Sequence, residues 1–318
     1  MSGRLVKIWS GICGKKAEVT ASLFETLRTR LLGKVAADEP LRRHTTWRVG
    51  GPADLFIAPA DRAELVLVLQ LLAAAGVPWV VLGAGSNLLV RDGGIRGAVL
   101  HTGGLRRLAF IGNDGVQAEG GVPLMSLIRE SAARGLAGLE ALAGIPGTVG
   151  GSVAMNAGAA GREMADVVRE VVLAGPQGEE VWREDRLEFA YRRSNLPADR
   201  VLAAATLQLQ AADPARIEEE IHGRLRQRQS SQRVGAPNAG SVFKNPQGQQ
   251  AWRLIDVAGL RGKSIGGAQV AEKHANFIVN RGGATARDIL TLIELVRDRV
   301  WANSGIELEP EVRIIGED

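Results

Sequence analysis

The spacing of apolar and polar residues changes several times along the chain after residue 53. Where apolar residues recur every three to four positions, the pattern predicts amphipathic helices. Asp61 and Thr285 are each followed three residues later by an acidic residue, a spacing typical of a helix start. The predicted helices cover residues 65–75, 123–134, 214–229 and 285–303.

Shorter apolar runs predict strands. Trp79–Leu82 is expected to be a short buried strand, and it leads directly into a glycine turn, where a ligand can be sought. Residues 167–174 and 180–182 predict a hairpin, and residues 201–210 and 309–315 predict two more strands. This mixture predicts an α+β fold.

The length of 318 residues favours two domains. Hydrophobic residues make up 45% and charged residues 23%, which excludes wholesale disorder and a coiled-coil rod. The composition becomes strongly charged at Asp213, and we expect a domain boundary there. Residues 1–21 are interpreted as an N-terminal extension without a readable role.

Charge and cysteine content exclude several classes of protein. The 39 basic and 35 acidic residues leave a net charge of only +4, so no nucleic-acid partner is expected. The single cysteine, Cys13, and four scattered histidines favour a cytoplasmic location and no metal site. No segment resembles a signal peptide or reaches the roughly 20 apolar residues of a membrane span, so no membrane partner is expected.

Forty glycines are unusual, since glycine has an average share of about 7%. One glycine loop comprises Gly83, Ala84, Gly85, Ser86, Asn87 and Leu88. It fails as a dinucleotide fingerprint because Leu88 stands where the third glycine belongs. Its backbone N–H groups still suit a phosphate or pyrophosphate. From this loop alone, a tight turn that binds no ligand is an equally good explanation of the glycines.

A second stretch, residues 144–158, contains five glycines with apolar residues between them. The apolar residues argue for a packed loop that a flat or charged ligand can approach, in preference to a flexible linker. Ser241 has no nearby His or Asp, so a hydrolase triad is rejected. Two charged segments are interpreted as structural rather than functional. One is a solvated helix face formed by Arg224, Arg226, Arg228 and Arg233, and the other is a surface ion-pair ladder formed by Glu309, Glu311 and Arg313.

Taken in order, six motifs closely resemble the UDP-N-acetylenolpyruvoylglucosamine reductases, also called UDP-N-acetylmuramate dehydrogenases. The resemblance covers residues 22 to 318. The motifs are TTWRVGGPAD at 45–54, LGAGSNLLV at 82–90, the glycine-rich stretch 144–158, YRRS at 191–194, GSVFKNP at 240–246 and EPEVRIIG at 309–316.

The resemblance implies a vanillyl-alcohol-oxidase/PCMH-type FAD-binding fold over residues 22–212, with lobes at 22–104 and 105–212. A smaller α/β substrate-binding domain over residues 213–318 follows it. It also implies noncovalent FAD, with NADPH as the hydride donor. The residues that correspond to FAD contacts are Gly83 to Leu88 together with Gly144, Ile145, Pro146, Gly147, Gly150, Gly151, Asn156 and Gly158.

By the same resemblance, the substrate is UDP-N-acetylglucosamine enolpyruvate, an intermediate of peptidoglycan synthesis. Ser241 takes the general-acid position, and Arg192 and Glu311 take the positions that stabilise the developing enolate. A carboxyl group in that place must be protonated, or act through a shared proton, to be useful, and the sequence leaves its protonation state open. Tyr191, Lys244 and Asn245 correspond to weaker substrate contacts.

The chain departs from many relatives at Arg233 and Ala160, and its 211–214 junction lacks the insertion that carries a tyrosine lid. It therefore resembles the subclass without that lid. Two rival hypotheses are a flavin oxidase with another substrate and a nucleotide-sugar sensor without turnover. The oligomeric state stays open, with a monomer as the simplest expectation.

Overall fold

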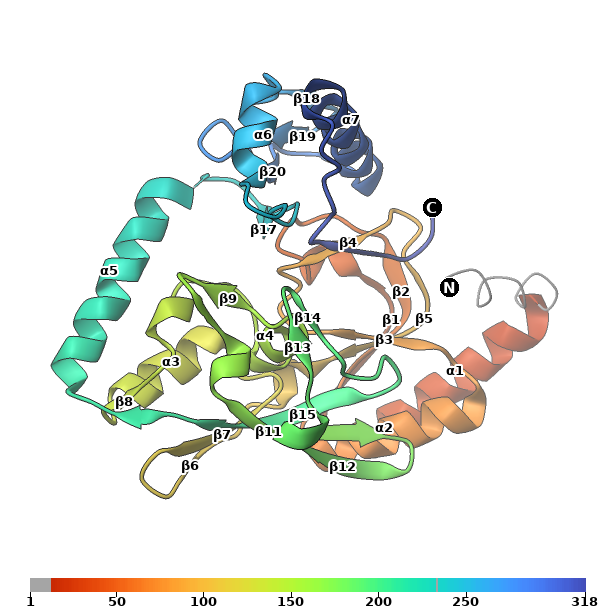
Figure 1. Cartoon of the computed structure of the whole chain (residues 1–318). Helices are drawn as coiled ribbons and strands as arrows, with labels where there is room; N and C mark the ends of the chain where they lie inside the picture. The colour runs from red at the N-terminus through yellow and green to blue at the C-terminus, as the bar shows by residue number, and fades with distance from the viewer. Residues whose placement is uncertain (1–12, 233) are drawn as a thin grey trace.

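The computed structural model describes residues 13–232 and 234–318 (Figure 1). Most of the expected N-terminal extension, residues 1–12, and the departure at Arg233 lie outside the described residues. Helix α1 (Cys13–Arg30) continues without a break through residue 22, where the first domain was expected to begin. Leu23, Leu27 and Leu31 pack in the same core as α2 (Arg62–Ala75), so this helix is part of the folded body.

The first sheet has the order β1 (Lys34–Pro40), β2 (Pro52–Ala58), β5 (Ile95–His101), β3 (Trp79–Leu82). The pair β1–β2 is antiparallel, whereas β2, β5 and β3 run parallel. Helix α2 makes the crossover between β2 and β3 and is capped by Asp61, which accepts from the Glu64 backbone N–H. The Glu64 carboxylate does not complete a capping box with Asp61. It instead accepts hydrogen bonds from the backbone N–H groups of Leu32, Gly33 and Ala60. The expected burial of Trp79–Leu82 is wrong except for Leu82, because β3 is an edge strand.

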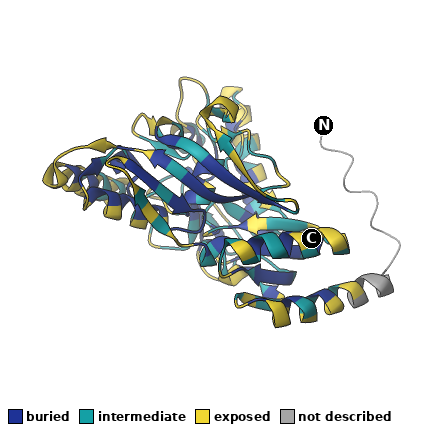
Figure 2. Cartoon of the chain, turned by 90° about the horizontal axis from the view of Figure 1, so that it is seen from below, coloured by how far each residue is buried: buried dark blue, intermediate teal, exposed yellow. Residues whose placement is uncertain are grey.

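The second sheet is antiparallel, in the order β12 (Gly178–Arg183), β11 (Val168–Gly175), β15 (Val201–Gln208), β7 (Gly115–Glu119), β6 (Leu108–Ile111). It contains the predicted hairpin as β11 and β12. Helices α3 (Leu124–Ala132) and α4 (Val149–Ala154) pack on one face, and α2 contributes to the core on the other. Its central strands are buried, as Figure 2 shows from below.

Short strand pairs complete this region: β8 (Leu136–Ala137) with β16 (Gln210–Ala211), β9 (Gly158–Ala159) with β10 (Arg162–Glu163), and β13 (Phe189–Ala190) with β14 (Arg193–Ser194).

Helix α5 (Pro214–Gln232) follows at the predicted place. Ile217 and Ile221 pack into the core of the second sheet, so α5 belongs by its contacts to the preceding region. Beyond it, a four-stranded sheet has the order β17 (Asn238–Ser241), β20 (Phe277–Asn280), β19 (Ala268–Val270), β18 (Ser264–Ile265). Helices α6 (Ala251–Val257) and α7 (Ala286–Ser304) pack with one face of it (Figure 1). The predicted capping box of Thr285 and Asp288 begins α7.

The C-terminal segment returns to the first half of the chain. The predicted strand 309–315 is shorter than expected: only β21 (Arg313–Ile315) is a strand, and it pairs in parallel with β4 (Leu88–Val90). The predicted ion-pair ladder is wrong, because Glu309 pairs with Lys244 and Glu311 with Arg192. Trp47 is fully buried in the C-terminal core and donates to the Ile278 carbonyl at 2.7 Å. The C-terminal domain is therefore tied to the loop before β2 through Trp47 and to β4, which follows β3, through β21.

None of the described helices is long and apolar enough to cross a membrane. In the described part of the chain, no group of three His, Cys, Asp or Glu side chains is arranged to hold a metal ion.

A histidine pair lies at the end of the first sheet. His44 stacks on Phe56 with ring centroids 4.2 Å apart and lies 5.7 Å from His101. Burial lowers the pKa of His101 to about 4, helped by nearby positive charge from His44, Arg106 and Lys34. The folded protein therefore holds His101 neutral.

This lowered pKa predicts an acid-sensitive fold. Between pH 6.5 and about 4 the unfolded chain binds a proton at His101 that the folded chain rejects, so stability falls as the pH falls. We expect His101→Asn to make the melting temperature fall less steeply over this range. The exposed His222 provides the matched control, His222→Asn. Equal slopes for wild type and His101→Asn in thermal melts would contradict the assignment.

Candidate functional site

Arg192 and Glu311 meet across 119 residues of sequence. Arg192 Nε donates to Glu311 Oε1 at 3.1 Å, and Nη2 donates to the Gly158 carbonyl at 2.9 Å. Both side chains are largely buried, with 18% and 19% of their surface exposed. The predicted glycine stretch and two predicted catalytic residues therefore meet at one point.

The tip of the β13–β14 hairpin positions Arg192. Its backbone has a φ of +56°, in the left-handed region that side chains other than glycine rarely adopt. Two contacts with the glycine stretch hold the hairpin: Ser194 Oγ donates to the Ala154 carbonyl, and Asn156 Nδ2 donates to the Ala190 carbonyl. Asn156 is fully buried; its side chain also bonds to Glu163 and Ala165, and its backbone N–H donates to the Val153 carbonyl. The expected cofactor contact is thus left to its backbone carbonyl.

Ser241 lies at the end of β17, and the residues after it lead to Glu311. The Val242 carbonyl accepts from the Glu311 backbone N–H at 2.8 Å, so the two segments run side by side. Lys244 donates its backbone N–H to the Glu309 carbonyl at 2.9 Å and its Nζ to Glu309 Oε1 at 2.6 Å. The three predicted catalytic residues thus belong to one region, with Ser241 placed next to Glu311 through Val242.

Tyr191 and Asn245 connect the hairpin to the C-terminal domain. The Asn245 backbone N–H donates to the Tyr191 hydroxyl at 3.4 Å, and its Oδ1 accepts from the Ala251 N–H, at the start of α6. The Tyr191 ring remains 46% exposed beside the Arg192 guanidinium. These two predicted substrate contacts therefore lie together at the edge of the site, with the tyrosine accessible.

Burial raises the pKa of Glu311, while the charge and hydrogen bond of Arg192 and the charge of Lys244 oppose that rise. Burial outweighs the two cations. The carboxyl group is accordingly held closer to its protonated form than a surface glutamate, which suits a group that must face a developing negative charge.

The two glycine loops lie against each other. Ser86 Oγ donates to the Pro146 carbonyl at 3.0 Å, and a Cβ atom on Gly83 would lie 2.8 Å from Thr148 Oγ1. Asn87 Nδ2 also donates to the Glu311 carbonyl at 3.1 Å. The loop after β3 therefore contacts both the second glycine loop and the segment that carries the predicted carboxyl group.

The backbone of these loops fits the pyrophosphate of a dinucleotide cofactor. Among the described residues, no backbone N–H from Gly83 to Asn87 donates to a protein acceptor, and those of Gly144 and Gly147 also lack one. Polar backbone groups are normally paired, so a run of free donors at a glycine turn is a site for an anion. The expected FAD therefore fits the donors that this fold leaves available.

Gly85 is the glycine with the least freedom to change. Its φ is +63°, and a Cβ atom there would lie 2.1 Å from the His44 carbonyl oxygen. We expect Gly85→Ala to displace the loop from Thr45 and to yield protein that retains little flavin. Gly112→Ala is the matched control, because its φ is +60° with no atom within 4 Å, so it adds only about 1–2 kcal/mol of backbone strain. Full flavin content in purified Gly85→Ala, read by absorbance, would contradict this.

The arginines of α5 are not all solvated, as the sequence pattern had suggested. Arg226 is exposed and Arg224 pairs with Glu220, but Arg228 turns inward and packs on Gly144. Arg228 Nη1 donates to the Gly144 carbonyl at 3.4 Å. Burial, and next the charge of Arg192, lower the pKa of Arg228. Two cationic side chains therefore face the second glycine loop, which suits an anionic ligand.

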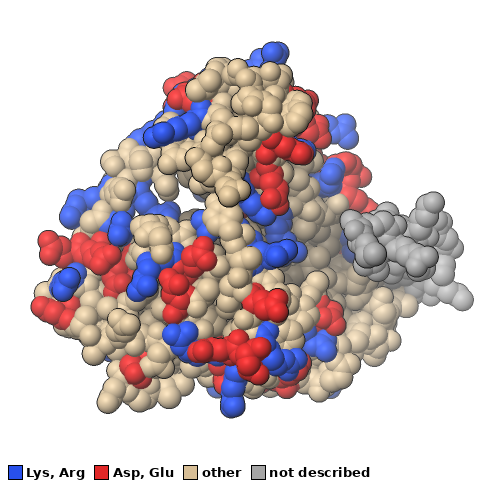
Figure 3. Space-filling model, in the orientation of Figure 1, with Lys and Arg blue, Asp and Glu red and all other residues tan. Residues whose placement is uncertain are grey.

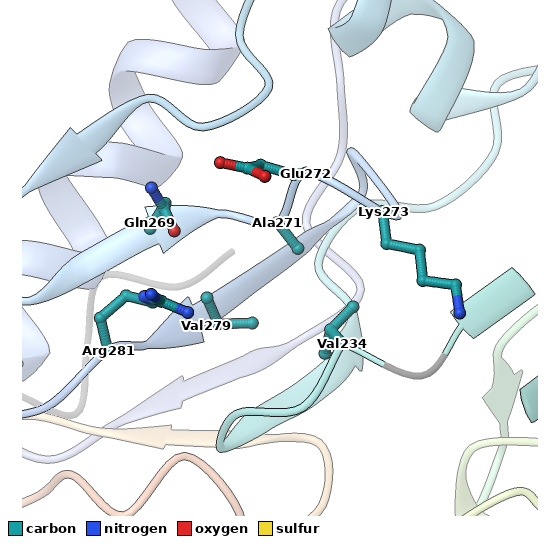
Figure 4. Close-up of a pocket in the computed structure, with 7 residues that line it drawn as sticks. All are labelled: Val234, Gln269, Ala271, Glu272, Lys273, Val279 and Arg281. Atoms are coloured by element: carbon teal, nitrogen blue, oxygen red, sulfur yellow. The ribbon is translucent and has the colours of Figure 1, made fainter.

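The open face of the C-terminal sheet carries a pocket of about 260 Å³. Ser241 pairs with Phe277, and Val279 two residues further lines the pocket, so Ser241 and the pocket share this face. Figure 4 shows its polar side chains, from Gln269, Glu272, Lys273 and Arg281, around the apolar side chains of Val234, Ala271 and Val279. Lys and Arg side chains also border the hollow between the C-terminal domain and the body of the protein (Figure 3).

Comparisons with known proteins agree with this geometry. Residues 53–183 match the family described as FAD binding domain, and residues 232–315 match UDP-N-acetylenolpyruvoylglucosamine reductase, C-terminal domain. The expected class of fold is confirmed: an FAD-binding domain in two lobes, followed by a smaller C-terminal domain. The chain is an oxidoreductase of the FAD-binding class.

The chain belongs to the UDP-N-acetylenolpyruvoylglucosamine reductase family. It is 56% identical over 283 residues to the enzyme of that name from Syntrophotalea carbinolica, covering 89% of this chain and 95% of that one. It is 50% identical to the one from Geobacter metallireducens, over 93% of this chain and 99% of the other. The crystal structure of UDP-N-acetylenolpyruvylglucosamine reductase from Thermus caldophilus superimposes with a TM-score of 0.76 at 36% identity, covering 89% and 98% of the two chains.

Sequence reasoning missed three residues of this region. Trp47 belongs to the first motif, but nothing in that motif indicates its role as an anchor in the C-terminal core. Arg228 could have been separated from its neighbours by the apolar spacing of α5, since Ile221 and Leu225 lie on the same side. Asn276, which bonds to the strand after Ser241, has no signal in the sequence pattern alone.

Proposed function

We propose that this protein reduces UDP-N-acetylglucosamine enolpyruvate to UDP-N-acetylmuramate, a step of peptidoglycan precursor synthesis, with FAD and NADPH. The observation that carries the proposal is the convergence of Arg192, Glu311 and the Ser241 strand beside two glycine loops with free backbone donors. Membership of the reductase family over both domains supports it. FAD supplies, when bound, the hydride that it has received from NADPH.

The residues of the chain handle the charge and the proton. As the hydride reaches the β-carbon of the enolpyruvyl group, negative charge develops on its α-carbon and carboxylate. Arg192 offers N–H donors for that carboxylate, and a protonated Glu311 donates to the enolate. Ser241 Oγ then gives its proton to the α-carbon. A serine hydroxyl is a weak acid, so its use fits a strongly basic carbanion.

We assign the glycine loops to the cofactor. The free backbone N–H groups of Gly83 to Asn87 receive the pyrophosphate, and the stretch from Gly144 to Gly158 covers the flavin. The contact between Ser86 and Pro146 keeps the two loops at a fixed separation. The hydrogen bond from Asn87 to the Glu311 carbonyl connects the cofactor loop with the catalytic carboxyl group.

The UDP part of the substrate is assigned to the cationic edge of the site. Lys244, Asn245 and Arg228 suit the diphosphate, and the pocket on the same sheet face as Ser241 is lined by both polar and apolar side chains. Tyr191, the lone tyrosine of the chain, already lies at this edge. We therefore assign the protein to the subclass without a tyrosine lid. A cytoplasmic location and a monomeric state complete the proposal.

An NADPH oxidation assay tests the function. Purified yellow protein should oxidise NADPH rapidly only when UDP-N-acetylglucosamine enolpyruvate is present, with UDP-N-acetylmuramate formed in equal amount. Oxidation that is independent of this substrate, with oxygen consumed and a simple alcohol oxidised, would support the flavin oxidase instead. Binding of the UDP-sugar without any NADPH oxidation would support the sensor.

A further inference from the structure

Asn276 holds the strand that carries Ser241. It is 4% exposed and directly precedes β20. Its Nδ2 donates to the Phe243 carbonyl at 2.8 Å, and its Oδ1 accepts from the Phe243 N–H at 2.9 Å. Its own carbonyl accepts from the Val242 N–H at 2.8 Å. Three hydrogen bonds from one residue therefore fix the two positions after Ser241.

Regular strand pairing ends at this point, which explains why a side chain is needed. The β17–β20 ladder pairs Ser241 with Phe277 and is irregular between Asn238 and Ser241. Phe243 therefore has no β20 residue opposite it, and the amide group of Asn276 takes the place of a backbone partner. Only an amide side chain offers both an N–H donor and a carbonyl acceptor of this size.

The other edge of the same strand carries Glu311. The Val242 carbonyl accepts from the Glu311 N–H at 2.8 Å, and Phe243 forms a bridge with Pro310. The strand after Ser241 thus lies between Asn276 and the segment of Glu311. A shift of Val242 or Phe243 therefore changes the position of the serine hydroxyl relative to the carboxyl group.

We propose that Asn276 is a positioning residue for the protonation step: through Val242 and Phe243 it keeps Ser241 and Glu311 at the correct separation. The inference rests on the proposed function and adds to it a residue that acts through the backbone of its neighbours. Proton transfer depends steeply on distance and direction, so a small shift of this strand slows it strongly. Transfer of hydride from NADPH does not require Ser241, so that half of the cycle is insensitive to Asn276.

Anaerobic stopped-flow measurements on the flavin-loaded protein separate the two halves. Asn276→Leu removes the donor and the acceptor at similar size, and Asn276→Asp retains the acceptor but replaces the donor, which keeps the test valid if the leucine variant does not fold. We expect flavin reduction by NADPH to change by less than about twofold in both variants. Reoxidation by UDP-N-acetylglucosamine enolpyruvate should slow by about tenfold or more, equivalent to about 1.4 kcal/mol. The solvent deuterium isotope effect on reoxidation should increase.

Asn280→Leu is the matched control. Asn280 is also buried in β20, and it bonds to the Trp47 carbonyl and to the N–H groups of Gly282 and Ala284, away from Ser241. It should lower the melting temperature similarly while its reoxidation rate per bound flavin stays unchanged. If the Asn276 variants lose melting temperature but not reoxidation rate, the residue is only structural and the inference is overturned. Equal loss of both half-reactions overturns it too. Failure of the reduced wild type to be reoxidised by the enolpyruvyl substrate would instead overturn the proposed function.

Discussion

Ser241→Ala should form a yellow protein that NADPH reduces at the wild-type rate and that makes almost no UDP-N-acetylmuramate. The hydroxyl is removed from the end of β17, while Val242 and Phe243 keep their hydrogen bonds to Glu311 and Asn276. The loss is therefore confined to the proton donor. Positioned proton transfer contributes about 10²–10⁴-fold in rate, and reoxidation by the enolpyruvyl substrate should fall by that factor. Stopped-flow absorbance of the flavin measures both steps in one sample.

Ser264→Ala is the matched control for this experiment. Ser264 lies exposed in β18 of the same sheet, and its hydroxyl bonds only to the Gly262 carbonyl. Its reoxidation rate should equal that of the wild type. If Ser241→Ala retains turnover within a few-fold, Ser241 is not the acid, and another group or water must supply the proton.

Much of the fold could be predicted from sequence because its signals are local. The capping box of Thr285 and the period of the following apolar residues placed α7 to within about two residues, a typical error for helix ends. The predicted strand 309–315 is too long for a long-range reason. Only residues 313–315 form a strand, with β4, whereas residues 309–311 bond irregularly to residues 242–244 and the side chains of Glu309 and Glu311 face Lys244 and Arg192. No periodicity within the segment contains that information.

The domain boundary illustrates the same distinction. The charged composition after Asp213 correctly marks where α5 begins, but composition cannot show which core receives its apolar face. Ile217 and Ile221 pack with the second sheet, and the C-terminal family match begins at residue 232. We therefore propose that the substrate-binding domain begins after α5 and that this helix belongs to the FAD-binding region.

For the candidate site, the resemblance supplies a set of predicted residues but not their arrangement in space. Ser241, Arg192 and Glu311 come from three distant segments, and only the structure shows that Glu311 is held by Val242 and Asn87 through its backbone and by Arg192 through its side chain. The sequence alone does not determine whether the Glu311 carboxyl group is protonated. Burial favours the protonated form, because it raises the pKa of Glu311 against two nearby cations.

Arg192→Lys should have the second large effect, although it preserves the charge. The arginine side chain bonds at once to Glu311 and to the Gly158 carbonyl, and its planar fork also suits a carboxylate, whereas lysine is a single flexible point charge. We expect reoxidation by the substrate to fall by about 10²–10³-fold, as when one donor to a developing anion is lost. Reduction by NADPH should be unchanged. Arg226→Lys, at an exposed site on α5, is the control, and a loss of less than fivefold in Arg192→Lys would contradict the role.

Replacing both partners in turn determines which form of Glu311 works. If the protonated carboxyl is the active form, activity declines as the pH rises through the pKa of Glu311. Arg192→Met removes the largest influence that lowers this pKa, so the decline should move to higher pH in its residual activity. Glu311→Gln remains neutral and should show no such decline, while Glu307→Gln, an exposed control, should behave as the wild type.

The pH dependence of stability tests the same assignment independently. A raised carboxyl pKa stabilises the fold at low pH, and this contribution is lost as the pH rises through that pKa. The melting temperature of Glu311→Gln should therefore rise relative to wild type with increasing pH, and a fall would show that the ionised carboxylate is the form that the site favours.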